Sequence, residues 1–591
     1  MSVPLIDPRD LSFLLYDWLK LESLCERPRY EAHSREIFDQ VLDTAVQIAT
    51  EKFQPHAAKL DQQPPSWDGE RVHLIPEVKE AFDAFAEAGF MAVSFDEDHG
   101  GMQLPYIVSQ ATMAIFYAAN TASAAYPLLT MAAANLIAHH GNAEQKATWL
   151  APMLEGRFTG TMCLSETQAG SSLGDLRSQA TPQADGTYRL TGDKMWISAA
   201  EHDLAENIVH LVLARTPGAP PGVKGISLFL VPKHLEGGAR NGVEISGLNH
   251  KMGYRGTVNT VLHFQDAVAY RIGEENQGLS FMFHMMNEAR VGVGLGAAML
   301  GYAGYLYSLD YAKQRPQGRP LTQRDPTSPP VMIIEHADVR RMLLAQKAYV
   351  EGGLALSLFC ARLVDDEKTL PTEEARQDAK LLLDLLTPIA KAWPSDWCLE
   401  ANKLAIQVLG GYGYTQEYPV ERYYRDNRLN PIHEGTNGIQ GLDLLGRKVR
   451  TADGRALQLL LERVQAAIVA AWDVPAVSDS AAALGEAVGK ATAATTACMG
   501  AAMEGDVERA LGNASVYLDL LGHTVVGWLW LEQATLAAAR LEAGVGDADF
   551  HRGKIQACRY FARWELPKTG PWAQILENLD DTCITMQEAW F

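Results

Sequence analysis

The segment with the most chemical potential is Tyr424–Gln440, which reads YRDNRLNPIHEGTNGIQ. Glu434 stands in it between His433 and Gly435, and Pro431 comes shortly before. Glycine and proline predict a bend, which can aim the carboxylate into a cleft. A partly desolvated glutamate beside a ligand has a raised pKa, as a general base near neutral pH requires. A glutamate followed by glycine, taken alone, is more often a solvated loop residue. Whether Glu434 has a catalytic role therefore depends on the other motifs of the chain.

Two further segments lie in a β-rich region, CLSETQAGSS from Cys163 and GDKMWIS from Gly192. The first is rich in glycine and serine, which are small donors suited to a phosphate or a ring oxygen. Trp196 and Ser198 are two residues apart, so a strand places the indole and the hydroxyl on one face. An indole face can form the wall of a site for a flat heteroaromatic ring, and a tryptophan packed in the core is the alternative.

Two glycine patterns suggest nucleotide binding. QVLGGYG, from Gln407, ends a helical pattern in glycines whose N–H groups could approach a pyrophosphate, and an ordinary helix C-cap is the equal alternative. Gly292-x-Gly294-x-x-Ala297 matches a dinucleotide fingerprint, with Asp310 near the expected position of a ribose-binding acid. The residues before it have a helical pattern and not that of a strand, so close helix packing is the better interpretation.

The elements that must position these residues change along the chain. Apolar residues recur at helical spacing over 35–160, short β-rich runs occupy 161–275, and helical patterns return over 276–450. Alanine-rich helical sequence fills 451–591, and residues 1–34 form an N-terminal segment. This order lacks the strand–helix alternation of a doubly wound sheet. We therefore expect a mainly α fold with a central β domain.

Composition excludes several function classes. The 591 residues contain 51 Lys and Arg against 72 Asp and Glu, a net charge of −21, without a basic run. This charge disfavours nucleic acid and anionic membranes as partners. Seven scattered cysteines without a C-x-x-C pair suggest neither disulfides nor a metal site. The early acidic residues argue against a signal peptide, and no strictly apolar stretch has membrane-spanning length, so we expect a cytoplasmic protein without membrane insertion.

Together and in this order, the motifs resemble those of the acyl-CoA dehydrogenase family of flavoproteins. C-L-S-E-x-x-A-G-S, K-M-W-I-S, Q-V-L-G-G-Y-G-Y and Y-R-D-x(7)-E-G-T resemble the family's signatures over about residues 35–450. The C-terminal extension resembles the longer bacterial branch, which includes enzymes for long-chain acyl-CoAs and for 3-methylmercaptopropionyl-CoA. The resemblance implies an α domain, a β-barrel-like domain, a four-helix α domain and an additional helical domain.

The resemblance also implies the site and its chemistry. Glu434 would remove the α-proton of an acyl-CoA, giving a trans-2-enoyl-CoA, while FAD accepts the β-hydride. The residues implied to contact FAD are Leu164, Ser165, Trp196, Ser198, Arg315, Gln407, Gly410, Gly411 and Thr436. Those implied to contact substrate are Ser171, Arg290 and Gly435. An electron-transfer flavoprotein would be the next acceptor, and a homodimer or homotetramer is expected because Gln407–Gly411 would reach a neighbouring subunit's FAD.

Some residues depart from the family pattern. Gly438 replaces a common glutamine, and the loop after Gln314 lacks a phenylalanine, which weakens the assignment of Arg315. His433 replaces a common tyrosine and either tunes the base or, as the better interpretation, simply packs. The small residues of Ala118–Tyr126 leave room for a long acyl chain or pack against another helix. An acyl-CoA oxidase and a flavin-retaining binding protein are the alternative functions.

Overall fold

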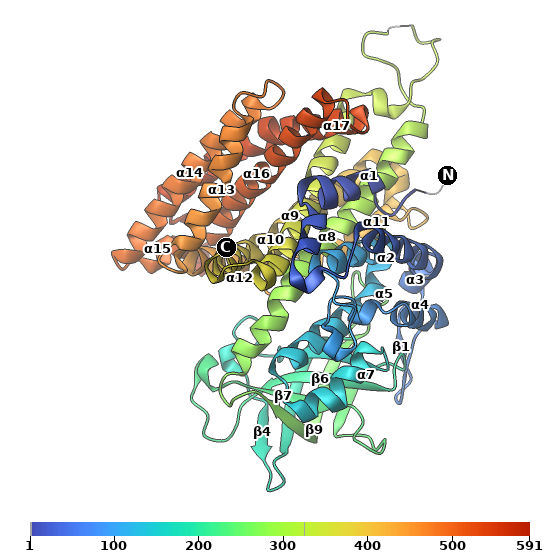
Figure 1. Cartoon of the computed structure of the whole chain (residues 1–591), viewed down its shortest axis with the longest axis vertical. Coiled ribbons are helices and arrows are strands. Elements are labelled where there is room, and N and C mark those ends of the chain that lie inside the picture. The colour runs from blue at the N-terminus through green and yellow to red at the C-terminus, as the bar shows by residue number, and fades with distance from the viewer. Residues whose placement is uncertain (1–2, 324) are drawn as a thin grey trace. The chain divides into compact units, whose positions relative to one another are not determined.

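The computed structural model describes residues 3–323 and 325–591, apart from the side chains of residues 284 and 287, and divides the chain into two compact units. One, here called the β-containing unit, comprises Arg29–Gly292. The other, here called the helical unit, comprises Met1–Pro28 and Val293–Phe591. The long helix α8 (Gly278–Gln314) begins in the first unit and ends in the second (Figure 1).

The β-containing unit combines helices with one large sheet. Its helices are α2 (Arg35–Ile48), α3 (Ala57–Gln62), α4 (Pro76–Glu87), α5 (Tyr106–His140), α6 (Ala143–Gln145) and α7 (Ala151–Leu154), and β1 (Ser66–Trp67) pairs with β2 (Val72–His73). The large sheet contains β3 (Phe158–Cys163), β4 (Gln179–Pro182), β5 (Tyr188–Ser198), β6 (Asn207–Ala214), β7 (Ser227–Pro232), β8 (Val243–Leu248) and β9 (Asn259–Ile272). Its strand order is β3-β6-β7-β9-β5-β4, with β8 also paired to β9. The β3–β6 pair is parallel and the others are antiparallel.

Strand β6 shows why the sheet forms a core. Each of its residues is buried, because both faces of the strand are covered. Leu211 belongs to an apolar cluster with residues of α5, whereas Val212 belongs to a second cluster with residues of β5, β7, β8 and β9. Burial on both faces explains why apolar residues occupy consecutive positions of this strand on either side of His210, since alternation is expected only when one face meets water.

Helix α5 is broken at Asn120, where the backbone leaves the helical region. The Asn120 amide donates to the Phe53 carbonyl, the Ser123 hydroxyl contacts the His56 ring at 2.8 Å, and the Tyr126 hydroxyl donates to the Gly256 carbonyl. These contacts favour the packing interpretation of Ala118–Tyr126 over an open pocket. By length and composition α5 could cross a membrane, but 61% of its most apolar window is buried inside the protein.

The helical unit is built from long helices and their short connections. Besides the end of α8 it contains α1 (Pro8–Ser12), α9 (Ala337–Thr369), α10 (Glu373–Leu409), α11 (Val420–Asn427), α12 (Asn437–Gly446), α13 (Arg455–Ala471), α14 (Ser478–Met503), α15 (Val507–Leu511), α16 (Ala514–Glu542), α17 (Ala548–Tyr560), α18 (Thr569–Glu577) and α19 (Thr582–Thr585). Figure 1 shows α13, α14 and α16 side by side, and α16 is largely buried among its neighbours.

Two glycines allow close helix packing in this unit. A Cβ on Gly294 would lie 1.8 Å from the Ala390 carbonyl oxygen, so α8 and α10 touch here through the backbone. The fingerprint-like glycines therefore lie within a helix, as expected from the helical pattern before them. A Cβ on Gly441 would lie 2.6 Å from the Ala514 carbonyl oxygen, so the C-terminal extension packs closely against α12.

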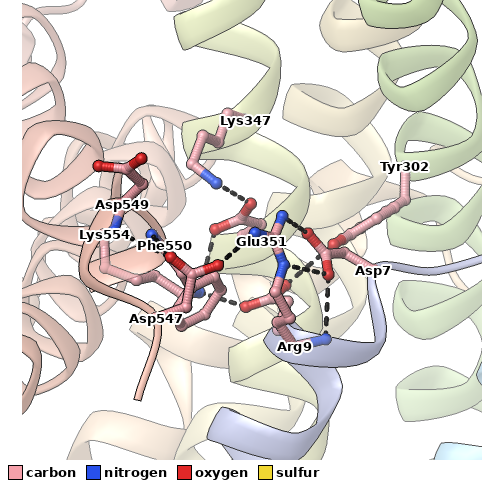
Figure 2. Close-up of polar contacts among 10 residues, drawn as sticks. Asp7, Arg9, Tyr302, Lys347, Glu351, Asp547, Asp549, Phe550 and Lys554 are labelled. Atoms are coloured by element: carbon pink, nitrogen blue, oxygen red, sulfur yellow. Dashed lines mark hydrogen bonds and ion pairs between the residues drawn. The ribbon is translucent and has the colours of Figure 1, made fainter. Parts of the chain in front are cut away.

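A buried group of charges joins three distant parts of the helical unit. This charged cluster consists of Asp10 on α1, Lys347 and Glu351 on α9, and Lys554 on α17. Figure 2 shows both lysines reaching Glu351, and Lys554 lies 3.0 Å from that carboxylate. Lys554 also pairs with Asp10, which accepts a hydrogen bond from the Tyr302 hydroxyl. The cluster ties the N-terminal segment and the C-terminal extension to α9.

The observed architecture confirms the expected fold class. It is mainly helical, with one central β region and additional helices after residue 450.

Candidate functional site

The predicted site residues fall into two groups, one in each unit. The β-containing unit holds Leu164, Ser165, Ser171, Trp196, Ser198 and Arg290. The helical unit holds Arg315, Gln407, Gly410, Gly411, Glu434, Gly435 and Thr436.

Trp196 lies at a β-bulge in β5. The β5–β9 register shifts between Lys194 and Ile197, and Trp196 has a left-handed φ of 65°. Lys194 and Ile197 are buried, while Trp196 is 60% exposed. The Asn259 amide secures the bulge by donating to the Trp196 carbonyl and to the Ser198 hydroxyl oxygen, at 3.0 and 3.1 Å. A tryptophan packed in the core is therefore excluded, and the bulge, not simple alternation, turns the indole outward.

The loop after β3 is fastened to β5 just before this bulge. The buried Lys194 ammonium donates to the Leu164 carbonyl at 3.0 Å and to the Glu166 carboxylate at 2.9 Å, and the Met195 N–H donates to the Ser165 carbonyl at 2.9 Å. Leu164 and Ser165 are thus held beside the Trp196 bulge. The structure brings together four residues that the family resemblance assigned to flavin contact.

Glu166 anchors the same loop. Its carboxylate accepts hydrogen bonds from the Ser178 hydroxyl at 2.7 Å and from the backbone N–H groups of Arg177 and Ser178. Burial works to raise the pKa of Glu166, but the Lys194 charge and these hydrogen bonds outweigh it and hold the pKa at about 2. Burial lowers the pKa of Lys194, and the Glu166 charge opposes this shift. A fully hydrogen-bonded ion pair makes the loop rigid.

The glycines that follow α10 leave open space. Gly410 has a φ of 63°, and its N–H donates to the carbonyls of Ile406 and Gln407 in the last turn of the helix, so it is a C-cap. A Cβ built on Gly410 or Gly411 would meet nothing within 4 Å, which leaves this backbone approachable as well. The Arg315 guanidinium lies 5.5 Å from the centre of the Tyr412 ring. Arg315 therefore belongs beside these glycines, and Gln407 lies in the last turn of α10.

Glu434 has an uncommon backbone conformation. Its φ is 53° and that of Gly435 is 83°, so two consecutive residues are left-handed. Such a conformation costs a non-glycine residue about 1–3 kcal/mol and persists only where the surroundings impose it. The Gln440 amide donates to the carbonyls of Glu434 and Gly435, both at 3.2 Å. The Thr436 hydroxyl oxygen accepts from the Ile439 N–H and begins α12. The half-buried carboxylate is thus carried on a fixed bend.

His433 has a neutral ring. Desolvation, together with the nearby charge of Lys391, lowers the pKa of His433 to about 3. Its Nε2 lies 3.1 Å from the Asn430 side-chain oxygen. The ring is therefore held by a hydrogen bond and carries no positive charge near neutral pH.

The residues implied to contact substrate in the β-containing unit have different settings. Ser171 is exposed in the loop after β3. Arg290 is buried in α8, and its guanidinium lies 5.8 Å from the centre of the Phe283 ring. Their roles toward substrate stay predictions.

Sequence reasoning missed the residues that hold the site in place. Lys194 and Glu166 stand inside the quoted motifs, and a lysine within a strand pattern beside a glutamate-bearing loop could have indicated a buried pair. Gln440 and the asparagines near Glu434 gave no comparable indication, because an isolated amide side chain is common on protein surfaces.

The residues present fit a flavin nucleotide. An exposed indole on a rigid bulge, flanked by the half-buried hydroxyls of Ser165 and Ser198, offers a flat apolar surface and hydrogen-bond donors to a polar heteroaromatic ring. The open backbone at Gly410 and Gly411 beside Arg315 suits a pyrophosphate.

Comparison with family models covers most of the chain. Residues 36–157 match the acyl-CoA dehydrogenase N-terminal domain, 161–267 its middle domain and 276–449 its C-terminal domain. Residues 460–587 match a domain described as acetyl-CoA dehydrogenase C-terminal like.

Individual relatives match over nearly their whole length. The 3-methylmercaptopropionyl-CoA dehydrogenase of Ruegeria pomeroyi is 39% identical over 87% of this chain and 88% of its own. The broad-specificity linear acyl-CoA dehydrogenase FadE5 of Mycobacterium tuberculosis is 36% identical over 90% of both chains. A Bacillus anthracis acyl-CoA dehydrogenase, solved in complex with FAD, shares the fold with a TM-score of 0.74 at 21% identity, over 96% of this chain and 91% of its own.

Proposed function

Because this chain belongs to the acyl-CoA dehydrogenase family and is thus an oxidoreductase, we propose that it is an FAD-dependent enzyme that converts an acyl-CoA thioester to its trans-2-enoyl-CoA. The family assignment rests on the relatives and the domain models. The assignment of individual residues rests on their geometry in this chain and on the motifs that they occupy.

In this proposal the two groups of site residues have separate tasks. Leu164, Ser165, Trp196 and Ser198 hold the flavin ring, and Arg315, Gln407, Gly410 and Gly411 hold the adenine and pyrophosphate end of an FAD bound to a neighbouring subunit. Bound FAD supplies a hydride acceptor for the β-hydrogen of the substrate. An oligomer follows from the second task, since those residues serve another copy of the chain.

Glu434 is the proposed general base, and its carboxylate removes the α-proton of the thioester. The backbone N–H of Glu434 donates to the thioester carbonyl oxygen, which stabilises the negative charge that develops there. Thr436 assists at the flavin, and Gly435, Ser171 and Arg290 contact substrate.

One observation supports this assignment most strongly. Glu434 and Gly435 form a left-handed pair whose carbonyls are both bound by Gln440. Strained backbone of this kind gathers at active sites, because it needs dedicated support that an ordinary surface loop lacks. A carboxylate with a fixed position is what proton abstraction from carbon requires.

The Glu434→Gln variant tests the proposal. It should retain FAD and bind acyl-CoA but lose at least about 10²–10⁴-fold in kcat, the contribution of a positioned base. Glu417→Gln is the matched control, since Glu417 is an exposed glutamate in the same unit. Full turnover by Glu434→Gln would refute the assignment.

The acyl group is addressed by a separate measurement. Anaerobic bleaching of the flavin with acyl-CoAs of about four to sixteen carbons, and with a thioether-containing acyl-CoA, ranks the substrates directly. We propose an electron-transfer flavoprotein as the next acceptor. Rapid peroxide formation in air without any other acceptor would instead indicate an oxidase.

A further inference from the structure

A row of buried amides leads through the helical unit to the Glu434 loop. Asn402 lies on α10, Asn427 ends α11, and Asn430 lies in the loop before Glu434; all three are 0% exposed. Asn427 Nδ2 donates to Asn402 Oδ1 at 2.7 Å, and Asn430 Nδ2 donates to Asn427 Oδ1 at 2.9 Å. The row ends at His433, whose Nε2 lies 3.1 Å from Asn430 Oδ1.

Two backbone carbonyls determine the direction of every bond in this row. Asn402 Nδ2 lies 2.8 Å from the Leu300 oxygen, and Asn427 Nδ2 lies 3.0 Å from the Ala297 oxygen. A carbonyl oxygen can only accept, so both amides must present their nitrogens to α8. Asn427 Oδ1 is then an acceptor that needs the Asn430 nitrogen, which leaves Asn430 Oδ1 facing His433.

His433 must therefore be the donor of the last bond. Its ring is neutral because desolvation and Lys391 lower its pKa to about 3, so one ring nitrogen carries a proton and the other does not. An oxygen acceptor at Nε2 selects the Nε2–H tautomer. Hydrogen bonds that all point the same way polarise one another, which strengthens each of them in a buried setting.

The row has a mechanical consequence at Glu434. The left-handed Glu434 is held from its C-terminal side by Gln440 and is preceded directly by His433. With His433 attached to the amide row, the strained residue is restrained on both sides. Misplacement of a reacting group by about 1 Å can cost about 10²-fold in rate, so such restraint matters for a base that attacks carbon.

We propose that Asn402, Asn427 and Asn430 form a polarised amide chain that holds His433 as a neutral Nε2–H donor and thereby positions Glu434. They and His433 are positioning residues, and the inference rests on the proposed role of Glu434 as the base. The amides supply direction and rigidity without adding a charge of their own beside the carboxylate.

Variants of His433 that differ in one donor test this proposal. His433→Gln keeps an N–H that can reach Asn430, whereas His433→Leu and the smaller His433→Ala remove it. We expect Leu and Ala to lower kcat by about 10–100-fold with KM changed less than about three-fold, and Gln to lose less than about five-fold. The isotope effect from an α-deuterated acyl-CoA should rise in Leu and Ala only, since slower proton abstraction then limits turnover. FAD content and the melting temperature are measured for each variant.

The outcomes separate positioning from packing. If Gln loses as much kcat as Leu and Ala, or if Leu and Ala lower only the melting temperature, the amide chain does not position the base and the proposal is overturned. Glu434→Gln in the same series keeps the two proposals distinguishable. Full turnover by Glu434→Gln would refute the assignment of Glu434 as the base. If Glu434→Gln is inactive but all His433 variants keep the kcat of the wild type, only the positioning role is refuted.

Discussion

Two buried polar networks of the helical unit hold distant segments together with different chemistry. The charged cluster joins α1, α9 and α17 through Asp10, Glu351, Lys347 and Lys554 (Figure 2). The amide chain joins α8, α10, α11 and the Glu434 loop through neutral side chains. Both are fully desolvated at their centres, since Lys554 and the three asparagines are 0% exposed.

The two networks differ in whether their members must balance charge or only satisfy hydrogen bonds. In the charged cluster each charge is needed to balance another, because an unpaired charge in a low-dielectric interior is costly. In the amide chain each group needs only a hydrogen-bond partner, and no member changes protonation state near neutral pH. A network of the second kind can support a catalytic carboxylate rigidly without a pH-dependent charge in the support.

The largest effect is expected when the charged cluster loses its central cation. Lys554→Met leaves Asp10 and Glu351 buried with only Lys347 to balance them, and removing one partner of a buried pair costs about 3–5 kcal/mol. Thermal unfolding of the purified flavoprotein should show a strongly lowered midpoint, while kcat of the folded protein at low temperature stays close to that of the wild type.

Lys403→Met is the matched control, because Lys403 pairs with Glu400 on the surface and is 65% exposed. Such a pair contributes little, so its midpoint should barely move. Equal shifts for the two lysine variants would contradict the distinction between a buried and an exposed ion pair.

Breaking the amide chain should cost less stability but more activity. Asn427→Leu keeps the branching and the number of heavy atoms of the side chain but removes the amide that donates to Ala297 and Asn402 and accepts from Asn430. The Ala297 carbonyl lies within α8 and keeps its helical hydrogen bond, so the main loss is the donor to the Asn402 oxygen. An unsatisfied buried polar group costs about 1–3 kcal/mol. Unlike Lys554→Met, this variant should also lower kcat, measured with saturating acyl-CoA below the unfolding range. A loss of stability equal to that of Lys554→Met, or an unchanged kcat, would break the comparison.

The pH dependence of stability should come from the charged cluster. Burial and repulsion from Glu351 raise the pKa of Asp10 to about 6, against the influence of Lys554 and Lys347. Its unfolded pKa is about 3.9, so the folded state holds this proton more tightly. The resulting stability is fully present below about pH 4 and is lost as the pH rises through about 6. Glu351, with a lowered pKa, gives the opposite dependence at lower pH, and Tyr302, with a raised pKa, titrates far above this window.

Asp10→Asn removes that titration. Relative to the wild type, the melting temperature of the variant should increase steadily when both are measured from pH 4 to pH 7. Parallel profiles for the two proteins would show that Asp10 does not titrate in this range.

The fold class could be predicted from the sequence because helices and strands leave patterns among residues that are close together in the chain. Helical spacing, β-rich runs and the glycines ending α10 each depend on neighbouring residues, and all three appear in the structure. Glu434 and Trp196 were found because each stands in a recognisable motif. The bulge at Trp196 was not predicted, since it depends on Asn259 from another strand.

The charged cluster and the amide chain could not be predicted from the sequence, for a physical reason. Asn402 and Asn427 are 25 positions apart, and Asp10 and Lys554 are brought together from opposite ends of the chain. A single polar residue carries no indication of whether it will be buried, because that depends on packing between elements. The residues proposed to carry chemistry were therefore easier to identify from the sequence than the residues proposed to position them.

The smallest change in melting temperature is expected at the exposed edge of the charged cluster, where buried and exposed charges of one network can be compared. Arg9 pairs with Asp7 and Asp547 at 2.8 Å each, yet its side chain is 56% exposed. Water screens these pairs, and holding a long flexible side chain in place costs entropy, so the net contribution of such pairs is small. Arg9→Ala should shift the melting temperature by no more than roughly one-fifth of the shift for Lys554→Met. A comparable shift for both variants would show that the geometry of the N-terminal segment, and not burial of charge, determines the strength of this cluster.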